Sequence, residues 1–400
     1  ALGGSLAPPG APASARPAGV AALSKSAQVL GGPPPGKPAP PAQRRATAPA
    51  KRERWEEDAL RDDELSQAIT GSKLSGMELE LRALAVKIAP SEDYMNSCRQ
   101  CLNQVKVAVA THDWGEDRPS LPTMVGSVMQ ETELEGCDID MALRFPSGGS
   151  QASRESRIEE FWEKLLLSPQ LAVYQTTRTF PHAKAPLTVE LKGSSPPTVA
   201  HLLVVDPVSA PARQTTVDQV IKTLCDHFGP ARDLVRLVKL WATNRSLSRE
   251  HDGYPSGLAW TLITICFLQA DKLVPPYKDV SKVQRSTMMP DILAMLRRFF
   301  EFLAAGQGAL ARGFSVVRGQ EFQAPPGEPV FVEDPAELLE GSKQLNLAQG
   351  TGGLQWQRVV EEAKKVSDRL AATPQRWFHW AEVFDPREMP PRKMARLSEA

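Results

Sequence analysis

The sequence predicts an α+β fold in which a mixed sheet with helices is followed by a mainly helical region. Residues 75–110 place apolar side chains at helical spacing, interrupted at Pro90, and this predicts two consecutive helices. Short runs of alternating polar and apolar residues then recur between 121 and 205, as in strands. Helical periodicity returns after Thr215. An α+β domain joined to a helical domain accounts for all three observations.

The expected elements can be placed one by one. Strands are expected at 121–125, 139–145, 172–177, 186–191 and 199–205, with an amphipathic helix at 153–167. The helical region is expected to contain helices at 217–227, 232–244, 255–272, 290–305 and 359–371. We expect the first helices of the chain to pack on this helical region.

The N-terminal part differs in composition from the rest. Residues 1–52 contain eleven prolines, seven Lys or Arg and no acidic residue. Such a segment cannot bury enough apolar surface to offset its ordering entropy. We therefore divide the chain into a disordered basic tail, 1–72, an α+β domain with its leading helices, 73–215, and a helical domain, 216–400. The tail suits contact with polyanions, although a linker or a targeting remnant explains it equally well.

Other features bound the class of protein. No apolar run reaches the roughly 18 residues that a membrane span needs, so we expect a soluble protein with no membrane contact. Five cysteines favour a reducing compartment, and Cys98 with Cys101 is interpreted as two positions on a helix rather than as half of a zinc site. The chain begins with Ala, as a fragment or a processed form would, and the sequence does not distinguish a cytoplasmic, nuclear or organellar location.

Two aspartates and a Gly-Ser turn are the residues most indicative of a chemical function. Asp138 and Asp140 lie two apart on an expected strand, so their side chains point to the same face. Paired carboxylates on one face suit Mg²⁺ or Mn²⁺. Gly126 and Ser127 stand earlier, where a strand passes into a helical turn whose backbone N–H groups favour a phosphate. The spacing predicts a triphosphate held beside two metal-binding carboxylates.

This strand, Gly-Ser turn, helix and DxD strand resembles the signature of the DNA polymerase beta-like nucleotidyltransferase superfamily. The resemblance implies a palm domain in which Asp138 and Asp140 are the catalytic and metal-binding residues, and Gly126 and Ser127 bind the triphosphate. Over about residues 75–375 the chain is similar to the terminal nucleotidyltransferase and poly(A) RNA polymerase family.

Three later segments carry that closer resemblance. Residues 234–242, LVRLVKLWA, look like the helix that sends a lysine, here Lys239, to the triphosphate. Residues 253–259, GYPSGLA, resemble the turn that touches the nucleotide, which implies a binding role for Ser256. Residues 330–335, VFVEDP, and then Asn346 resemble elements of the poly(A) polymerase-associated domain, with Asn346 implied near the nucleotide.

The sequence departs from the family at the third metal-binding carboxylate. His201 stands where that aspartate is expected, on the strand at 199–205. Imidazole is a poor ligand for Mg²⁺. Glu190, on the preceding strand, and Asp206, at the end of the same one, are possible substitutes.

Smaller departures concern the nucleotide itself. Glu131 stands where many relatives have a second glycine in the phosphate turn, Thr243 replaces a second lysine, and Leu258 replaces a tyrosine that stacks on the base. Leu345 replaces a histidine that helps some relatives select uridine.

Two functions follow from these observations. The first is a template-independent RNA nucleotidyltransferase that adds AMP, or else UMP, from ATP or UTP to an RNA 3′ end by metal-assisted phosphoryl transfer. The second is a degenerate member that binds RNA or a protein partner without turnover. A synthetase of 2′-5′ oligoadenylates is disfavoured by the Glu333–Asp334–Pro335 and Asn346 elements. We expect RNA affinity to come from the basic tail or from a protein adaptor, because no separate RNA-recognition module is evident.

Overall fold

The computed structural model describes residues 75–145, 151–175, 187–194, 198–205, 211–285, 291–305, 311–341, 344–372, 379–384 and 395–396. All of them lie within one compact unit, Ser66–Ala400. The predicted basic tail, 1–72, lies outside the described residues. None of the helices in the described part of the chain is long and apolar enough to cross a membrane.

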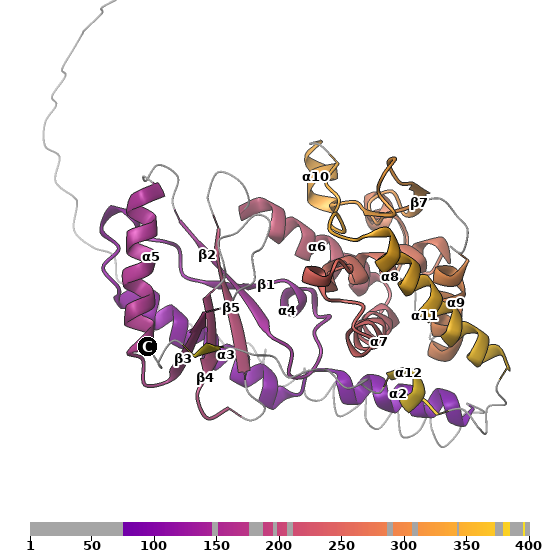
Figure 1. Ribbon diagram of the computed structural model, residues 1–400, viewed down its shortest axis with the longest axis horizontal. Helices are drawn as coiled ribbons and strands as arrows, with labels where there is room; N and C mark the ends of the chain where they lie inside the picture. The colour runs from indigo at the N-terminus through magenta and orange to yellow at the C-terminus, as the bar shows by residue number, and fades with distance from the viewer. Residues whose placement is uncertain are drawn as a thin grey trace, which may run out of the picture. The chain divides into compact units, whose positions relative to one another are not determined.

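A mixed sheet forms the first half of the fold, as the alternating pattern predicted. Its order is β1-β2-β5-β4-β3-β9, in which β2 and β5 are parallel and the other pairs are antiparallel (Figure 1). The strands are β1 (Thr123–Val125), β2 (Ile139–Arg144), β3 (Leu171–Gln175), β4 (Leu187–Leu191), β5 (Thr198–Val205) and β9 (Ala395–Arg396).

One face of this sheet is buried under helices. Ile139, Met141, Val189 and Leu202 point into a core that also contains side chains of α3 (Glu92–Thr111) and α5 (Gln151–Leu166). Because side chains alternate along a strand, the even-numbered residues of β2 and β4 and the odd-numbered ones of β5 point to the opposite face. Asp140 and His201 therefore lie on that opposite face.

The helix α3 contains the CxxC pair. Ser91 caps its N-terminus, where the Ser91 hydroxyl accepts the Tyr94 N–H at 3.1 Å. Cys98 and Cys101 are buried on the helix as free thiols, and burial raises their pKa values to about 11 and about 12. They are two positions on a helix, as interpreted from the sequence, and both lie in its buried face.

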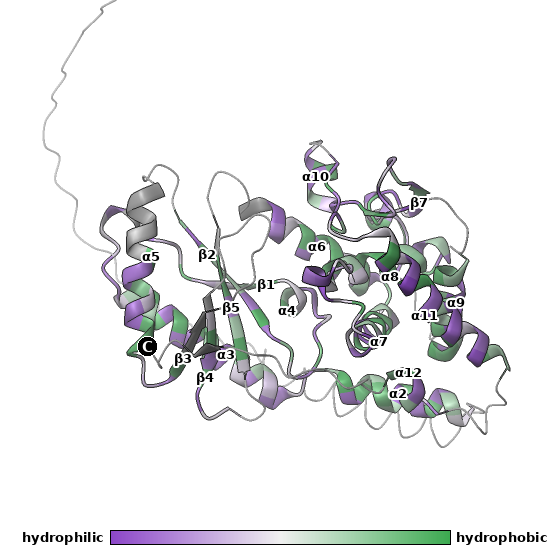
Figure 2. Cartoon of the chain, in the orientation of Figure 1, coloured by the Kyte–Doolittle hydropathy of each residue, from purple (hydrophilic) through white to green (hydrophobic). Residues whose placement is uncertain are grey.

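A second core is built almost entirely from helices. It contains α2 (Gly76–Ile88), α6 (Pro211–His227), α7 (Pro230–Asn244), α8 (Gly257–Ala270), α9 (Ile292–Ala304) and α11 (Gly353–Ala372). The helix α8 is buried from Ala259 to Gln269, which is why its sequence is apolar on every side. By contrast, α9 and α11 carry hydrophobic and hydrophilic stretches (Figure 2).

Strands also occur in this second half, which the sequence analysis missed. A small sheet of order β7-β6-β8 contains β6 (Arg312–Ser315), β7 (Gln320–Gln323) and β8 (Val330–Val332). The short helices α10 (Pro335–Glu340) and α12 (Ala381–Phe384) follow. The predicted boundary at residue 216 falls inside α6, and β9, near the C-terminus, pairs with β3 of the first sheet.

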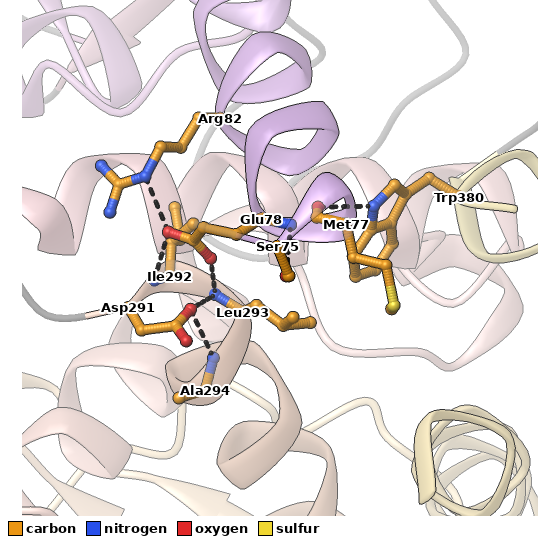
Figure 3. Close-up of polar contacts among 9 residues, drawn as sticks. All are labelled: Ser75, Met77, Glu78, Arg82, Asp291, Ile292, Leu293, Ala294 and Trp380. Carbon is orange, nitrogen blue, oxygen red and sulfur yellow. Dashed lines mark hydrogen bonds and ion pairs between the residues drawn. The ribbon is translucent and has the colours of Figure 1, made fainter. Parts of the chain in front are cut away.

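The first two helices divide between the two cores. While α3 packs under the mixed sheet, α2 packs with the helical core through Met77, Leu81 and Ala85. The carboxylate of Glu78 accepts the Leu293 N–H at 2.8 Å at the N-terminus of α9, beside the capping residue Asp291 (Figure 3). The expectation that the first helices pack on the helical region is thus right for α2 and wrong for α3.

Candidate functional site

Two carboxylates lie side by side on the face of the mixed sheet opposite its core. Asp138 immediately precedes β2 and Asp140 is its second residue. The hydroxyl of Tyr94 on α3 donates to the Cys137 carbonyl, which fixes the backbone just before Asp138. The Asp138 side chain is 18% exposed, so the pair is accessible to a ligand.

The predicted phosphate turn adjoins Asp140. Gly126 ends β1 with φ 71°, a conformation that L side chains rarely adopt. A Cβ at this position would stand 3.1 Å from Asp140 Oδ2, so only glycine lets the turn lie this close to the carboxylate. The helix α4 (Ser127–Gln130) starts at once after it. Gly126, Ser127, Asp138 and Asp140 therefore meet at one place, as the spacing predicted.

A buried aspartate from α6 supports the turn. Asp218 accepts the Gly126 N–H at 3.0 Å and the Gln130 side-chain amide at 2.8 Å. Burial raises the pKa of Asp218, while the hydrogen bonds from Gln130, Gly126 and Gln214 act against that rise. This residue was missed by the sequence analysis, although a charge beside Val217, Val220 and Ile221 in an apolar stretch was a visible signal.

His201 stands where the third carboxylate was expected. It faces Asp140 across the parallel β2–β5 pair, and its Nε2 lies 3.1 Å from Asp138 Oδ2. Its Nδ1 lies 3.0 Å from the hydroxyl of Thr188 on β4. A hydroxyl that donates to Nδ1 leaves the ring proton on Nε2, which then donates to Asp138. The histidine thus lies where a third acid was expected, and it bonds to Asp138.

Of the two proposed substitutes, only Glu190 lies within the described residues. Glu190 pairs with Val199 of β5, so a whole strand separates it from β2, a distance of roughly 10 Å between backbones. The register therefore does not bring Glu190 beside Asp138 and Asp140. Asp206 lies outside the described residues.

Basic residues of α7 hold the chain that joins the turn to β2. The Lys239 ammonium donates to the Thr132 carbonyl at 2.9 Å. Arg236 donates to the carbonyls of Glu131, at 2.9 Å, and Glu133, at 3.1 Å. Burial lowers the pKa of Lys239 and raises that of the Glu133 carboxyl. Lys239 is thus beside the turn, and its direct contact with a triphosphate stays a prediction.

A second pair of basic side chains binds a carboxylate instead. Glu131, the residue after α4, forms ion pairs with Lys222 of α6 and with Arg232 of α7, the latter at 2.9 Å. Arg232 has a further partner in Asp226. The departure noted in the sequence therefore places a negative charge on the phosphate turn.

The two remaining predicted residues, Ser256 and Asn346, lie in different parts of the fold. Ser256 caps α8, where its hydroxyl accepts the Ala259 N–H at 3.2 Å. A Cβ on the next residue, Gly257, would lie 3.9 Å from Lys239 Cε, so the start of α8 adjoins that lysine. Asn346, in contrast, is buried and its amide bonds to backbone groups of Val330, Val332 and Ala348. These contacts give Asn346 a structural role, and its contact with a nucleotide stays a prediction.

The carboxylate pair fits a divalent cation shared with a substrate. Proteins bind Mg²⁺ through one or two carboxylates and leave the other ligand positions to phosphates and water. Across the part of the chain that the structure describes, no group of three His, Cys, Asp or Glu residues is arranged to hold a metal ion.

Solved structures share this fold over most of the chain. The crystal structure of mtPAP in complex with CTP superposes with a TM-score of 0.63 at 14% identity, covering 82% of this chain and 75% of that chain. Cid1, described for its RNA terminal uridylyl transferase activity, gives 0.60 at 14% identity, covering 79% of this chain and 99% of that chain. A cytoplasmic RNA terminal U-transferase gives 0.59 at 13% identity, covering 78% and 99%.

These similarities concern the fold. No protein-family model and no curated protein matches the sequence. The chain has the nucleotidyltransferase palm fold with a helical part, and the resemblance stated from the sequence is confirmed at this level.

Proposed function

We propose that this chain, which shares its fold with terminal nucleotidyltransferases, transfers a nucleotide from a nucleoside triphosphate to the 3′ end of an RNA. The observation that carries the proposal is the close approach of Gly126 to Asp140, with Asp138 two residues earlier, on the face of the palm sheet opposite its core. A triphosphate beside the turn would present its α-phosphorus to that face. The attacking 3′ hydroxyl forms the new P–O bond while pyrophosphate leaves.

In this proposal, the residues of the site have separate roles. Asp138 and Asp140 would hold the divalent ion, which lowers the pKa of the attacking hydroxyl and braces the leaving pyrophosphate when bound. Gly126 allows the backbone to approach a phosphate. Asp218, by accepting the Gly126 N–H, fixes the turn in that conformation. Lys239 and Arg236 add positive charge along the following residues.

The nucleotide is proposed to be ATP, with UTP as the second candidate. Leu345 occupies the place of the histidine that helps some relatives select uridine, so nothing there favours uracil. The solved mtPAP structures include complexes with CTP, UTP and GTP, which shows that one protein of this fold accommodates different bases. Base preference is therefore a question for direct assay.

Binding without turnover is the second candidate, and His201 favours it. A palm that holds its metal with two carboxylates lacks the third acid that can act as base for the attacking hydroxyl. The contact of His201 with Asp138 further occupies one carboxylate oxygen. In this alternative the sheet face that carries Asp138 and Asp140 binds RNA or a protein partner, and a protein adaptor would direct the chain to its RNA.

The test is extension of a labelled oligo(A) RNA with each of the four NTPs, in Mg²⁺ and in Mn²⁺. The control is the Asp138→Ala, Asp140→Ala double variant, checked for folding by circular dichroism. Extension by the parent alone supports the transferase. If the folded parent extends RNA under none of these conditions, the binding alternative replaces it, and RNA retention by the same protein then tests that alternative.

A further inference from the structure

Four basic side chains converge on the segment after the phosphate turn, and they meet two kinds of partner. Arg236 and Lys239 donate to backbone carbonyls of residues 131–133. Lys222 and Arg232 instead bind the Glu131 carboxylate. A carbonyl is a dipole and leaves the positive charge of its donor uncancelled, whereas a carboxylate offsets it by a full unit. Asp233 also pairs with Arg236 and Asp226 with Arg232, so Glu131 is one of several carboxylates here and the one that pairs with Lys222.

Lys222 depends on Glu131 more than Arg232 does. Arg232 also pairs with Asp226, so it keeps an ionic partner when Glu131 is removed. For Lys222, Glu131 is the ionic partner that the structure provides. The Lys222 and Glu131 side chains are 33% and 40% exposed, so water and dissolved anions can reach both. A ligand with more negative charge could thus form an ion pair with Lys222 in place of Glu131.

The backbone of Glu131 is unusual in a way that supports a role for its side chain. Its φ of 58° lies in the left-handed region, where a residue other than glycine is unfavourable by roughly 1 kcal/mol. The turn geometry alone would favour glycine. The ion pairs to Lys222 and Arg232 are contacts that glycine could not make.

We propose that Glu131 is an intramolecular competitor of the triphosphate: its carboxylate occupies the positive charge beside the phosphate turn and so limits the affinity for nucleotide. The proposal rests on the proposed nucleotide binding and adds the residue that tunes it. A bound polyphosphate draws Lys222 away from Glu131, and the displaced carboxylate then repels the phosphates. Removal of the Glu131 charge strengthens binding, and the effect grows with the number of phosphates.

The test compares Glu131→Gln with the parent in the full chain, with titrations of ATP and AMP in Mg²⁺ followed by calorimetry. Glutamine keeps the size and backbone of the residue and removes the charge. The matched control is Glu321→Gln in β7, which removes a carboxylate paired with Arg312 in the other sheet. A Glu131→Gln, Lys222→Gln double variant shows whether the gain in ATP affinity requires the Lys222 ammonium.

The expected result is ATP affinity roughly threefold to tenfold tighter for Glu131→Gln, a smaller gain for AMP, and no gain for the control. The gain shrinks in the double variant. Unchanged or weaker ATP binding by a folded Glu131→Gln protein overturns the proposal, because the carboxylate then supports the turn rather than competing at it. If neither parent nor variant binds any NTP, the proposed nucleotide site itself is wrong, which is a distinct outcome.

Discussion

His201 faces Asp140, and its Nε2 lies 3.1 Å from Asp138 Oδ2, at the position where the sequence resemblance implied a third acid. Replacing it with aspartate places a carboxylate opposite Asp140 on the neighbouring strand. We expect His201→Asp to raise Mg²⁺-dependent nucleotide transfer on the order of tenfold or more, because a third acid can act as ligand and base. Single-turnover extension of labelled RNA measures this rate of transfer.

The matched control for that change is His201→Ala, which removes the imidazole without adding an acid. Three clustered carboxylates repel one another, so His201→Asp should melt at a lower temperature than the parent without metal and recover with Mg²⁺. Equal activity in the aspartate and alanine variants would show that the position does not serve the metal.

Gly126 offers a second test at the level of one residue. Gly126→Ala should cost about 1–3 kcal/mol of stability through its φ of 71°, and its Cβ should displace the Asp140 carboxylate. Gly136→Ala is the matched control, since Gly136 also has φ 71° but its added Cβ meets nothing within 4 Å. We expect thermal unfolding to show a loss for both variants and RNA extension to fall only for Gly126→Ala. If both variants lost RNA extension to a similar degree, the loss would be a consequence of reduced stability alone.

The sequence could predict contacts between residues that are close together in the chain, but not contacts between residues that are far apart in it. The shared face of Asp138 and Asp140, and the nearby Gly126, follow from strand geometry and short spacing. The contacts of Asp218 and Glu131 depend on how α6 and α7 pack against the turn, a long-range matter that no local pattern contains. The sequence placed His201 on a strand near the two aspartates, but its bonds to Asp138 and Thr188 required the strand register.

At the scale of elements, the N-terminus of α9 is held by two acids. Glu78 of α2 accepts the Ile292 and Leu293 N–H groups, while Asp291 accepts those of Leu293 and Ala294 (Figure 3). Arg82 pairs with Glu78 at 2.7 Å. Burial, followed by a hydrogen bond with Asp291, raises the pKa of Glu78.

This cap predicts a pH dependence with a definite sign. The folded state holds the Glu78 proton to a higher pH than the unfolded chain does, so its contribution is fully present below about pH 4.3 and declines as pH rises through the raised pKa. Glu78→Gln keeps an acceptor but cannot ionise. Relative to the parent, its free energy of unfolding should therefore increase with pH.

Urea denaturation between pH 4 and pH 8 measures this difference. Glu78→Ala serves as the comparison, because it leaves the Ile292 N–H without its Glu78 acceptor and should cost about 1–3 kcal/mol. A parent and a Glu78→Gln variant with parallel pH profiles would contradict the assignment of the proton to Glu78.

Elements differed in how well the sequence predicted them. Long amphipathic helices such as α7 and the strands β1 to β5 were found within a few residues of their bounds, because burial on one face leaves a clear period, whereas β9, with two residues, was not predicted. The strands β6, β7 and β8 have only three or four residues each, too few for alternation to show. The segment 330–335 contains both the VFVEDP motif and the strand β8.

At the scale of the whole molecule, the proposed function requires a source of RNA affinity. Residues 1–52 carry seven basic and no acidic residues, whereas the described residues lie in the unit Ser66–Ala400. We expect a chain that starts at Ser66 to keep its thermal unfolding temperature but to bind RNA more weakly at low salt. Each lost phosphate contact should reduce the salt slope of the logarithm of affinity by about 0.7.

Fluorescence anisotropy of a labelled RNA at several salt concentrations measures that slope for both chains. If the slopes are equal, the tail makes no phosphate contacts, and a protein adaptor or the palm face must supply the affinity.

The central claim, that Asp138 and Asp140 direct a triphosphate to an RNA 3′ hydroxyl, is tested most directly by transfer from an α-³²P-labelled NTP. The substrate RNA should carry either a free or a 3′-deoxy terminus, and the proteins are the parent and Asp140→Asn. The account predicts label on the free terminus with the parent and at least a roughly hundredfold lower rate with the variant. Label on neither terminus with the folded parent, or equal transfer by Asp140→Asn, would contradict it.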